Sequence, residues 1–224
     1  QSNVRNKHNF MNSQKHFTKK IRHSLKITTP PCAFTLYMET EDPKKWKVLE
    51  SEHLMRRPWL TVRRDKVLLP TGAINPEFYV LEYPDWVNVI AITDDRQFVM
   101  ERQYRHGLGE TCIELCAGVM EEGETPEQAA RRELEEETGY VGGTWTQLMT
   151  ISGNPSTTDN LTYCFIAQGV TYSGARHLDR TEDIEVVLMT PDEVYSLLLN
   201  DEMKQALMAA PLWRYFATMR SHDE

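Results

Sequence analysis

Three glutamates near the middle of the chain stand at a spacing that gathers their carboxylates on one side of a helix. Glu133, Glu136 and Glu137 lie at positions i, i+3 and i+4, which share a helix face. Like charges at that spacing repel one another, so the cluster favours a neutralising cation. Carboxylate oxygens are the protein ligands that Mg²⁺ prefers. The spacing therefore predicts divalent-metal chemistry.

The segment around these glutamates has the start and stop signals of a single helix. Thr125 is a favourable N-cap residue, Pro126 suits the first helical position, and Gln128 completes a capping box with Thr125. Gly139 is placed to end the helix in a left-handed conformation. A narrow apolar stripe would let the helix pack closely on a sheet. The residues of this stripe are Ala129, Ala130 and Leu134.

The composition indicates one domain of ordinary size, or one domain with a smaller appendage. The chain has 224 residues, of which 40% are hydrophobic, so it can bury a sizeable core, and it contains no apolar run that could span a membrane. Its net charge of −8 argues against a role in coating nucleic acid. An acidic protein that handles phosphates must recruit metal ions or concentrate its arginines locally.

The N-terminal segment differs in charge from the rest of the chain. We expect residues 1–45 to form a disordered or loosely docked tail, because residues 1–38 contain Lys and Arg but neither Asp nor Glu. The segment lacks the apolar stretch of a secretory signal, whereas a mitochondrial transit peptide stays open as an alternative. Residues 1–3 look like the remnant of an expression tag, and Met11 would then be a native start.

The four cysteines give no metal-binding pattern. None of them forms a CxxC pair, and no second pair of cysteines accompanies Cys112 and Cys116, as a metal site would require. We therefore expect buried, reduced thiols in a cytoplasmic compartment. The four residues are Cys32, Cys112, Cys116 and Cys164.

The order of the expected elements favours an α+β fold, in which helices cover a sheet. Residues 46–85 are expected to form an antiparallel β subdomain that is too small to stand alone, and residues 86–224 the main domain. The apolar run at 86–93 predicts a strand buried on both faces, and we expect it to form a hairpin with 97–104. The other strands are expected at 46–51, 59–69, 77–82, 111–115, 145–151, 161–168 and 184–189, and the closing helices at 191–199 and 201–219.

The glutamate helix and its lead-in resemble the Nudix box, which has a glycine, a glutamate and the run Arg-Glu-aliphatic-any-Glu-Glu-any-Gly-aliphatic. Tyr140 stands where the box ends on an aliphatic residue, and the other fixed positions agree. The resemblance implies an α/β/α sandwich, an α+β fold, with pyrophosphate hydrolysis as its activity. The matching residues are Gly118, Glu124, Arg132, Glu133, Leu134, Glu136, Glu137 and Gly139.

Over roughly residues 46–220, the chain is similar to the ADP-ribose and ADP-sugar pyrophosphatase branch of the Nudix family. RQYR at 102–105, CIELCAG at 112–118 and Pro155 carry this likeness. Members of the branch have an N-terminal β subdomain that exchanges across a homodimer. Three positions depart from the usual pattern of the branch. They are Cys116 in place of proline, the Gly-Asn-Pro-Ser run at 153–156 in place of Ser-Pro-Gly, and Asn160 where many members carry glutamate.

The resemblance implies that the chain hydrolyses ADP-ribose or a related nucleoside diphosphate sugar to AMP and a sugar phosphate, with Mg²⁺ or Mn²⁺ as cofactor. Glu136 and Glu137 would then serve catalysis through the metal, and Glu124 would brace the loop through an ion pair with Arg132. The implied metal ligands are the Ala117 carbonyl and the carboxylates of Glu133, Glu136 and Glu137.

The likeness also assigns catalytic and phosphate-binding roles outside the box. Glu182 would orient or deprotonate the attacking water, with Asp183 and Glu185 as rivals for this role. Arg105 would contact phosphate, because a guanidinium pairs bidentately with such oxygens. Glu114 would hold a ribose hydroxyl or a water on the metal.

Adenine recognition in this branch uses aromatic residues from the N-terminal β subdomain. Trp46 stands in a matching position, and Phe78 or Tyr79 could supply the opposite face of the base. Trp59 and Trp86 are expected to serve packing instead.

The sequence leaves alternatives for the substrate and for the class of protein. GDP-mannose or a dinucleoside polyphosphate could replace ADP-ribose within the enzyme class. A non-catalytic Nudix domain that senses nucleotide sugars is the other class, although such regulators generally have a degraded box and an attached DNA-binding module. We expect a cytoplasmic homodimer that binds a nucleotide sugar and has no nucleic-acid or membrane partner.

Overall fold

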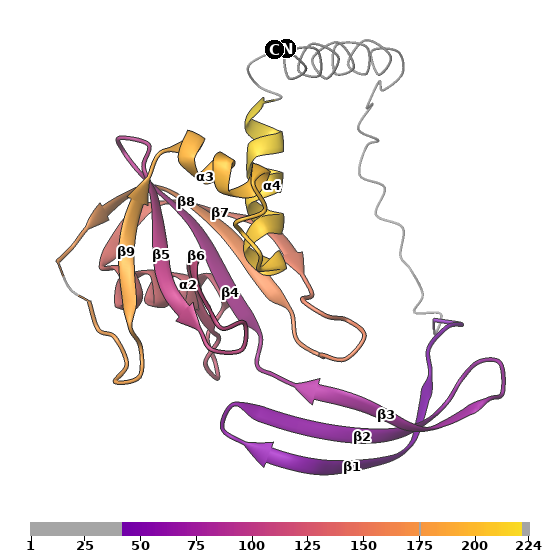
Figure 1. The fold of residues 1–224 in the computed structure, drawn as a ribbon. Helices are drawn as coiled ribbons and strands as arrows, with labels where there is room; N and C mark the ends of the chain where they lie inside the picture. The colour runs from indigo at the N-terminus through magenta and orange to yellow at the C-terminus, as the bar shows by residue number, and fades with distance from the viewer. Residues whose placement is uncertain (1–41, 175, 221–224) are drawn as a thin grey trace, which may run out of the picture. The chain divides into compact units, whose positions relative to one another are not determined.

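The computed structural model describes residues 42–174 and 176–220. These residues form a three-stranded sheet and a six-stranded sheet with helices (Figure 1). The expected basic tail lies outside the described residues up to position 41, as do the suggested tag remnant and native start. None of the helices in the described part of the chain is long and apolar enough to cross a membrane.

The three-stranded sheet is antiparallel, in the order β1-β2-β3. Its strands are β1 (Lys47–Arg57), β2 (Leu60–Leu68) and β3 (Ile74–Glu82). The strand expected at 46–51 is therefore too short. Every residue of β1 is exposed, so no alternation of buried and exposed side chains marks the second half of the strand. The strand continues because it pairs with β2 as far as Arg57↔Leu60.

The six-stranded sheet has the order β7-β8-β4-β6-β5-β9, in which β4 and β8 run parallel and the other neighbours antiparallel. β4 and β5 pair only at Ala91↔Val99 and Ile92↔Phe98, because β6 lies between them and pairs with both. The expected hairpin is thus right only near its turn. The strands are β4 (Trp86–Thr93), β5 (Phe98–Arg105), β6 (Glu110–Val119), β7 (Tyr140–Ile151), β8 (Thr162–Tyr172) and β9 (Ile184–Met189).

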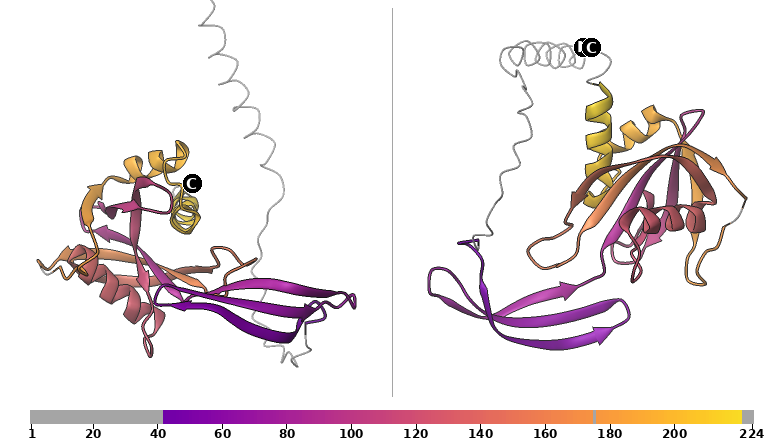
Figure 2. Two further views of the ribbon diagram at one scale, coloured as in Figure 1. Left: turned by 60° about the horizontal axis from the view of Figure 1, so that its bottom comes forward. Right: turned by 180° about the vertical axis from the view of Figure 1, so that it is seen from behind.

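Helices cover both faces of this sheet (Figure 2), which confirms the expected α+β fold. Val87 and Val89 of β4 pack with α2, whereas Ile90 and Ile92 pack with α4. The expectation that β4 is buried on both faces is therefore confirmed. The final helix begins at residue 206 rather than 201. The helices are α2 (Pro126–Glu133), η1 (Leu134–Thr138), α3 (Pro191–Leu199) and α4 (Ala206–Arg220).

The glutamate helix has the expected ends but not the expected last turn. Thr125 and Gln128 form the capping box, and Gly139 ends the helix with a φ of 74°. Between them, the α-helical geometry of α2 gives way to one π-helical turn, η1. π turns inside helices often occur at functional sites. Glu136 and Glu137 both lie on this turn.

The packing of this helix on the sheet can be tested at Leu134, which is 0% exposed among β-sheet and helix side chains. We expect Leu134→Ala to lower the free energy of unfolding by about 2–5 kcal/mol, because a buried leucine loses its contacts and leaves a cavity. Leu199→Ala is the matched control, since Leu199 is 58% exposed. Equal stability of the two variants in denaturant titrations would contradict the packing described.

Candidate active site

Glu137 lies against β6 rather than in solvent. Its Oε2 accepts hydrogen bonds from the Ala117 amide and the Cys116 thiol, each at 3.3 Å. Burial, followed by the negative charge of Glu133, raises the pKa of Glu137 to about 7. A carboxyl group with this pKa binds a proton or a cation readily at neutral pH.

Glu133 reaches β6 two residues farther along the strand. Its Oε1 accepts hydrogen bonds from the Val119 amide at 3.2 Å and from Arg132 at 2.9 Å. Burial raises the pKa of Glu133, although Arg132 acts against this shift. A Cβ atom on Gly118 would clash with the Glu133 carboxyl group, so a larger residue there would displace this carboxylate.

Arg132 connects the parts of the glutamate segment. Its guanidinium donates to Glu124 at 2.8 Å, to Glu136 at 3.0 Å and to the Val119 carbonyl at 2.9 Å. The expected ion pair between Arg132 and Glu124 is therefore present. Its hydrogen bond to Glu124 is the main reason why the pKa of Arg132 is raised. Arg132 thus holds the loop before α2 and the carboxylates after it in one arrangement.

These carboxylates face a cavity of about 470 Å³. The cavity brings together Arg105, Ala117, the three glutamates of the box and Glu182, all of which the sequence indicated. Trp46, Phe78 and Glu114 are not among its lining residues. The lining consists of Trp59, Gln103, Arg105, Ala117, Gly118, Val119, Glu121, Arg132, Glu133, Glu136, Glu137, His177, Asp179 and Glu182.

Glu114 lies beneath Arg105. The Arg105 guanidinium donates twice to Glu114 Oε2, at 2.9 and 2.5 Å, and Glu114 is buried. The other carboxylate oxygen, Oε1, has no hydrogen-bond partner among the described residues. Glu114 therefore orients the guanidinium in this structure rather than facing the cavity itself.

The aromatic residues are arranged differently from the expectation. Trp46 and Phe78 contact each other edge to face, with ring centroids 5.6 Å apart. Trp59, which we expected to serve packing, is 79% exposed and lines the carboxylate cavity, so that expectation is wrong. Trp59 follows Pro58 directly after β1, and a large aromatic residue at a turn is the signal that could have identified it.

Glu182 lies in the loop before β9. Its carboxylate accepts a hydrogen bond from the Asp179 amide at 2.8 Å. Of the rivals for its role, Glu185 pairs with Arg102 at 2.8 Å, and neither Glu185 nor Asp183 lines the carboxylate cavity.

Two contacts attach this loop to η1. The Arg176 guanidinium donates to the Glu137 carbonyl at 2.7 Å, and the His177 amide donates to the Glu136 carbonyl at 2.9 Å. His177 and Asp179 also line the cavity, which sequence reasoning missed. No motif marks these two residues, because only the loop contacts bring them to the site.

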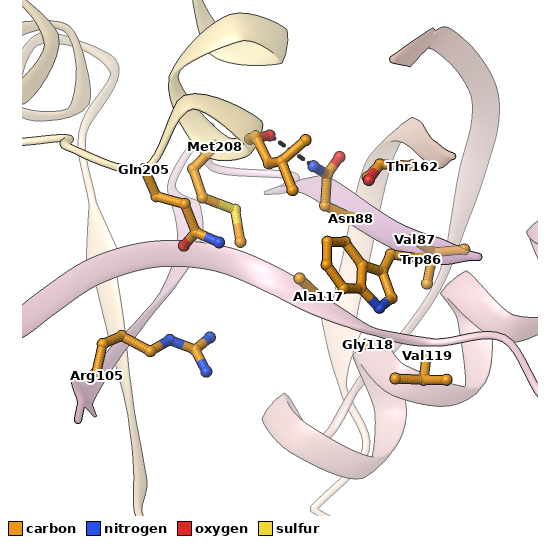
Figure 3. A pocket seen from close by; sticks show the side chains of 11 residues that line it. Trp86, Val87, Asn88, Arg105, Ala117, Gly118, Val119, Thr162, Gln205 and Met208 are labelled. Atoms are coloured by element: carbon orange, nitrogen blue, oxygen red, sulfur yellow. Dashed lines mark hydrogen bonds between the residues drawn. The ribbon is translucent and has the colours of Figure 1, made fainter. Parts of the chain in front are cut away.

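A second cavity has a volume of about 300 Å³, and Figure 3 shows the side chains that line it. Both cavities are lined by Arg105 and by residues 117–119. Asn88 donates to the Leu207 carbonyl at 2.8 Å. Three buried oxygens from residues of this cavity have no hydrogen-bond partner among the described residues. They are Asn88 Oδ1, Thr162 Oγ1 and Gln205 Oε1.

The first cavity suits a hard divalent cation. Glu133, Glu136 and Glu137 all line one space, and burial together with the charge of a neighbouring glutamate raises the pKa of Glu133 and of Glu137. A cation with oxygen ligands would remove this penalty. The arrangement therefore fits Mg²⁺ or Mn²⁺.

Comparison with known proteins places the chain among hydrolases. Residues 82–210 match the family described as NUDIX domain, and residues 46–81 match the family described as Nucleoside diphosphate sugar hydrolase N-terminal domain. The ADP-ribose pyrophosphatase of Bacillus subtilis is 31% identical over 164 residues, which cover 73% of this chain and 88% of that protein.

Two further proteins extend the comparison. The ADP-sugar pyrophosphatase of Mus musculus is 33% identical over 120 residues, covering 47% of this chain and 55% of that protein. A solved structure described as an ADP compounds hydrolase superposes with a TM-score of 0.71 at 22% identity, covering 82% of this chain and 98% of that one. This last likeness concerns the fold.

The raised pKa of Glu137 predicts a pH dependence of stability. The folded state holds this proton more tightly than the unfolded chain, so the metal-free protein should lose stability as the pH rises from 4.5 towards about 7. Calorimetric melting temperatures across this range should fall less for Glu137→Gln than for the unchanged protein, and Mg²⁺ should reduce the loss. Parallel curves for the two proteins without metal would contradict the burial described.

Proposed function

Because the chain belongs to the Nudix family of hydrolases, we propose that it cleaves the pyrophosphate bond of ADP-ribose or a related nucleoside diphosphate sugar, releasing AMP and a sugar phosphate. One observation carries this proposal: a single cavity combines the Glu133, Glu136 and Glu137 carboxylates with the Arg105 guanidinium. The likeness to the ADP-ribose pyrophosphatase of Bacillus subtilis supports the substrate class.

The residues of the cavity divide the chemistry among them. The carboxylates would hold Mg²⁺, or Mn²⁺ as a substitute, and the ion would neutralise phosphoryl oxygens of the substrate. Arg105 would bind a phosphate oxygen, and Glu114 would keep its guanidinium directed towards the cavity. Glu182 would orient the attacking water and accept its proton as the bond to phosphorus forms.

We propose that Trp59 stacks on the nucleobase, since it is exposed at the edge of the carboxylate cavity. Trp46 and Phe78 do not line this cavity, and we propose that they contact the base bound by a second subunit. A homodimer through the β1–β3 sheet would provide it. The exposed apolar residues of β1 support such an interface. They are Val48, Leu49, Leu54 and Met55.

The same observations support a division into an N-terminal β subdomain at 46–85 and a hydrolase domain at 86–224. We propose a reducing, cytoplasmic location, because the cysteines in the described part of the chain, Cys112, Cys116 and Cys164, are free thiols. The net charge of −8 favours a small nucleotide over nucleic acid as the partner.

The second cavity supports a site for the sugar. The Asn88 and Gln205 oxygens are acceptors without donors, and the Thr162 hydroxyl can both donate and accept. Sugar hydroxyls would supply the missing partners. Because Arg105 and residues 117–119 line both cavities, a phosphate beside Arg105 could place an attached sugar in the second one.

The activity is tested by incubating the protein with a panel of nucleoside diphosphate sugars and dinucleoside polyphosphates, with Mg²⁺ and with Mn²⁺. We expect AMP and ribose 5-phosphate from ADP-ribose. If GDP-mannose or a dinucleoside polyphosphate were cleaved preferentially, the proposed substrate would change but the proposed reaction would not. Binding of ADP-ribose without turnover would instead indicate a sensor and overturn the proposal.

Three variants test the assigned roles. Glu136→Gln and Glu137→Gln should abolish turnover with the fold preserved, because each loses a metal ligand, and Glu182→Gln should lower kcat by about 10²–10⁴-fold. Glu185→Gln is the control for Glu182, since Glu185 faces Arg102. Full activity of Glu137→Gln would contradict the metal assignment.

The sugar site is tested by Thr162→Val, which removes a buried hydroxyl at nearly constant volume. Losing one hydrogen bond of about 1.4 kcal/mol should raise KM for ADP-ribose about tenfold. Thr144→Val is the matched control, because Thr144 lies on β7 and is exposed. An unchanged KM for Thr162→Val would place the sugar elsewhere.

A further inference from the structure

A buried cluster of two carboxyl groups and one thiol lies behind the carboxylate cavity. Glu101 comes from β5, Cys116 from β6 and Glu137 from η1, and one potential ligand atom of each lies within 4.8 Å of the others. Their exposed fractions are 2%, 0% and 7%. Two of these residues, Glu101 and Cys116, have no role in the hydrolysis described above.

The cluster is only partly satisfied by hydrogen bonds. The Cys116 thiol donates to Glu137 at 3.3 Å. Glu101 Oε1 is buried and has no hydrogen-bond partner among the described residues. Burying such an oxygen without a partner costs free energy. The cluster therefore contains a buried carboxylate oxygen that the described residues leave without a hydrogen-bond partner.

A cation is a group that suits this cluster. Two carboxyl groups and one thiol are buried together, with a potential ligand atom of each within 4.8 Å of the others. A divalent ion would neutralise buried carboxylates and supply the missing partner for Glu101 Oε1.

We propose that Glu101, Cys116 and Glu137 form a binding site for a borderline-soft divalent ion of the Zn²⁺ class. A thiolate favours Zn²⁺ or Co²⁺, whereas Mg²⁺ prefers oxygen ligands. Ligand atoms lie about 2.0–2.3 Å from Zn²⁺. The ligand atoms of the three residues lie within 4.8 Å of one another, so small side-chain movements would bring all three within bonding distance of one ion. Because Glu137 also lines the cavity, an ion held by the three residues would lie close to that cavity.

This site is distinct from the hard-ion site of the Nudix box, although the two share Glu137. The proposal concerns ion binding and does not depend on the substrate that is hydrolysed.

The proposal is tested by titrating Co²⁺ into metal-free protein and recording the near-ultraviolet absorption that arises from cobalt–thiolate bonds. We expect this band in the unchanged protein and in a variant whose Cys32, Cys112 and Cys164 are all replaced by serine. The band should be absent in Cys116→Ser. It should persist in Glu133→Gln, which keeps all three ligands of the proposed site.

Calorimetric titration with Zn²⁺ in excess Mg²⁺ gives a second readout. Cys116→Ser and the nearly isosteric Glu101→Gln should each weaken Zn²⁺ binding more than about tenfold, while Glu185→Gln, at an exposed position of β9, should not. Glu101→Gln keeps the thiol, so it tests the site even if Cys116→Ser fails to fold. Absence of the cobalt band in the unchanged protein, or its presence in Cys116→Ser, would overturn the proposal.

Discussion

The burial of negative charge against β6 is the constraint on which the candidate site depends. A carboxylate removed from water must find hydrogen-bond donors, a proton or a cation. Glu133 and Glu137 find donors in the amides of Val119 and Ala117, which belong to the same strand. These two hydrogen bonds connect the glutamate helix to β6. The negative charge of the two carboxylates favours the binding of a metal ion.

The surrounding elements can be understood as supports for that contact. The capping box at Thr125 anchors one end of the helix, and Gly118 lets the strand approach the Glu133 carboxyl group. Arg132 joins the lead-in loop to the helix. The loop before β9 then docks on η1 through Arg176 and brings Glu182 into the cavity. The site is thus assembled from segments that are far apart in sequence.

Sequence reasoning predicted the local parts of this assembly and missed those set by distant contacts. The capping box, the end at Gly139 and the two-sided burial of β4 follow from residue types and their order. The length of β1 depends on its pairing with β2, because none of its side chains is buried. Only the tertiary structure brings Trp59 to the carboxylate cavity and Glu101 to the buried cluster with Cys116 and Glu137.

The π turn of η1 has a consequence for how this segment can change during evolution. Each residue rotates an α-helix by about 100°, so removing one residue from the turn would swing Glu136 and Glu137 around the axis relative to Glu133. A substitution alters one side chain, whereas a deletion would dismantle the whole ligand set at once. Substitutions should therefore be tolerated in this segment more often than insertions or deletions. The number of residues in the segment matters to the metal site as much as its acidic side chains do.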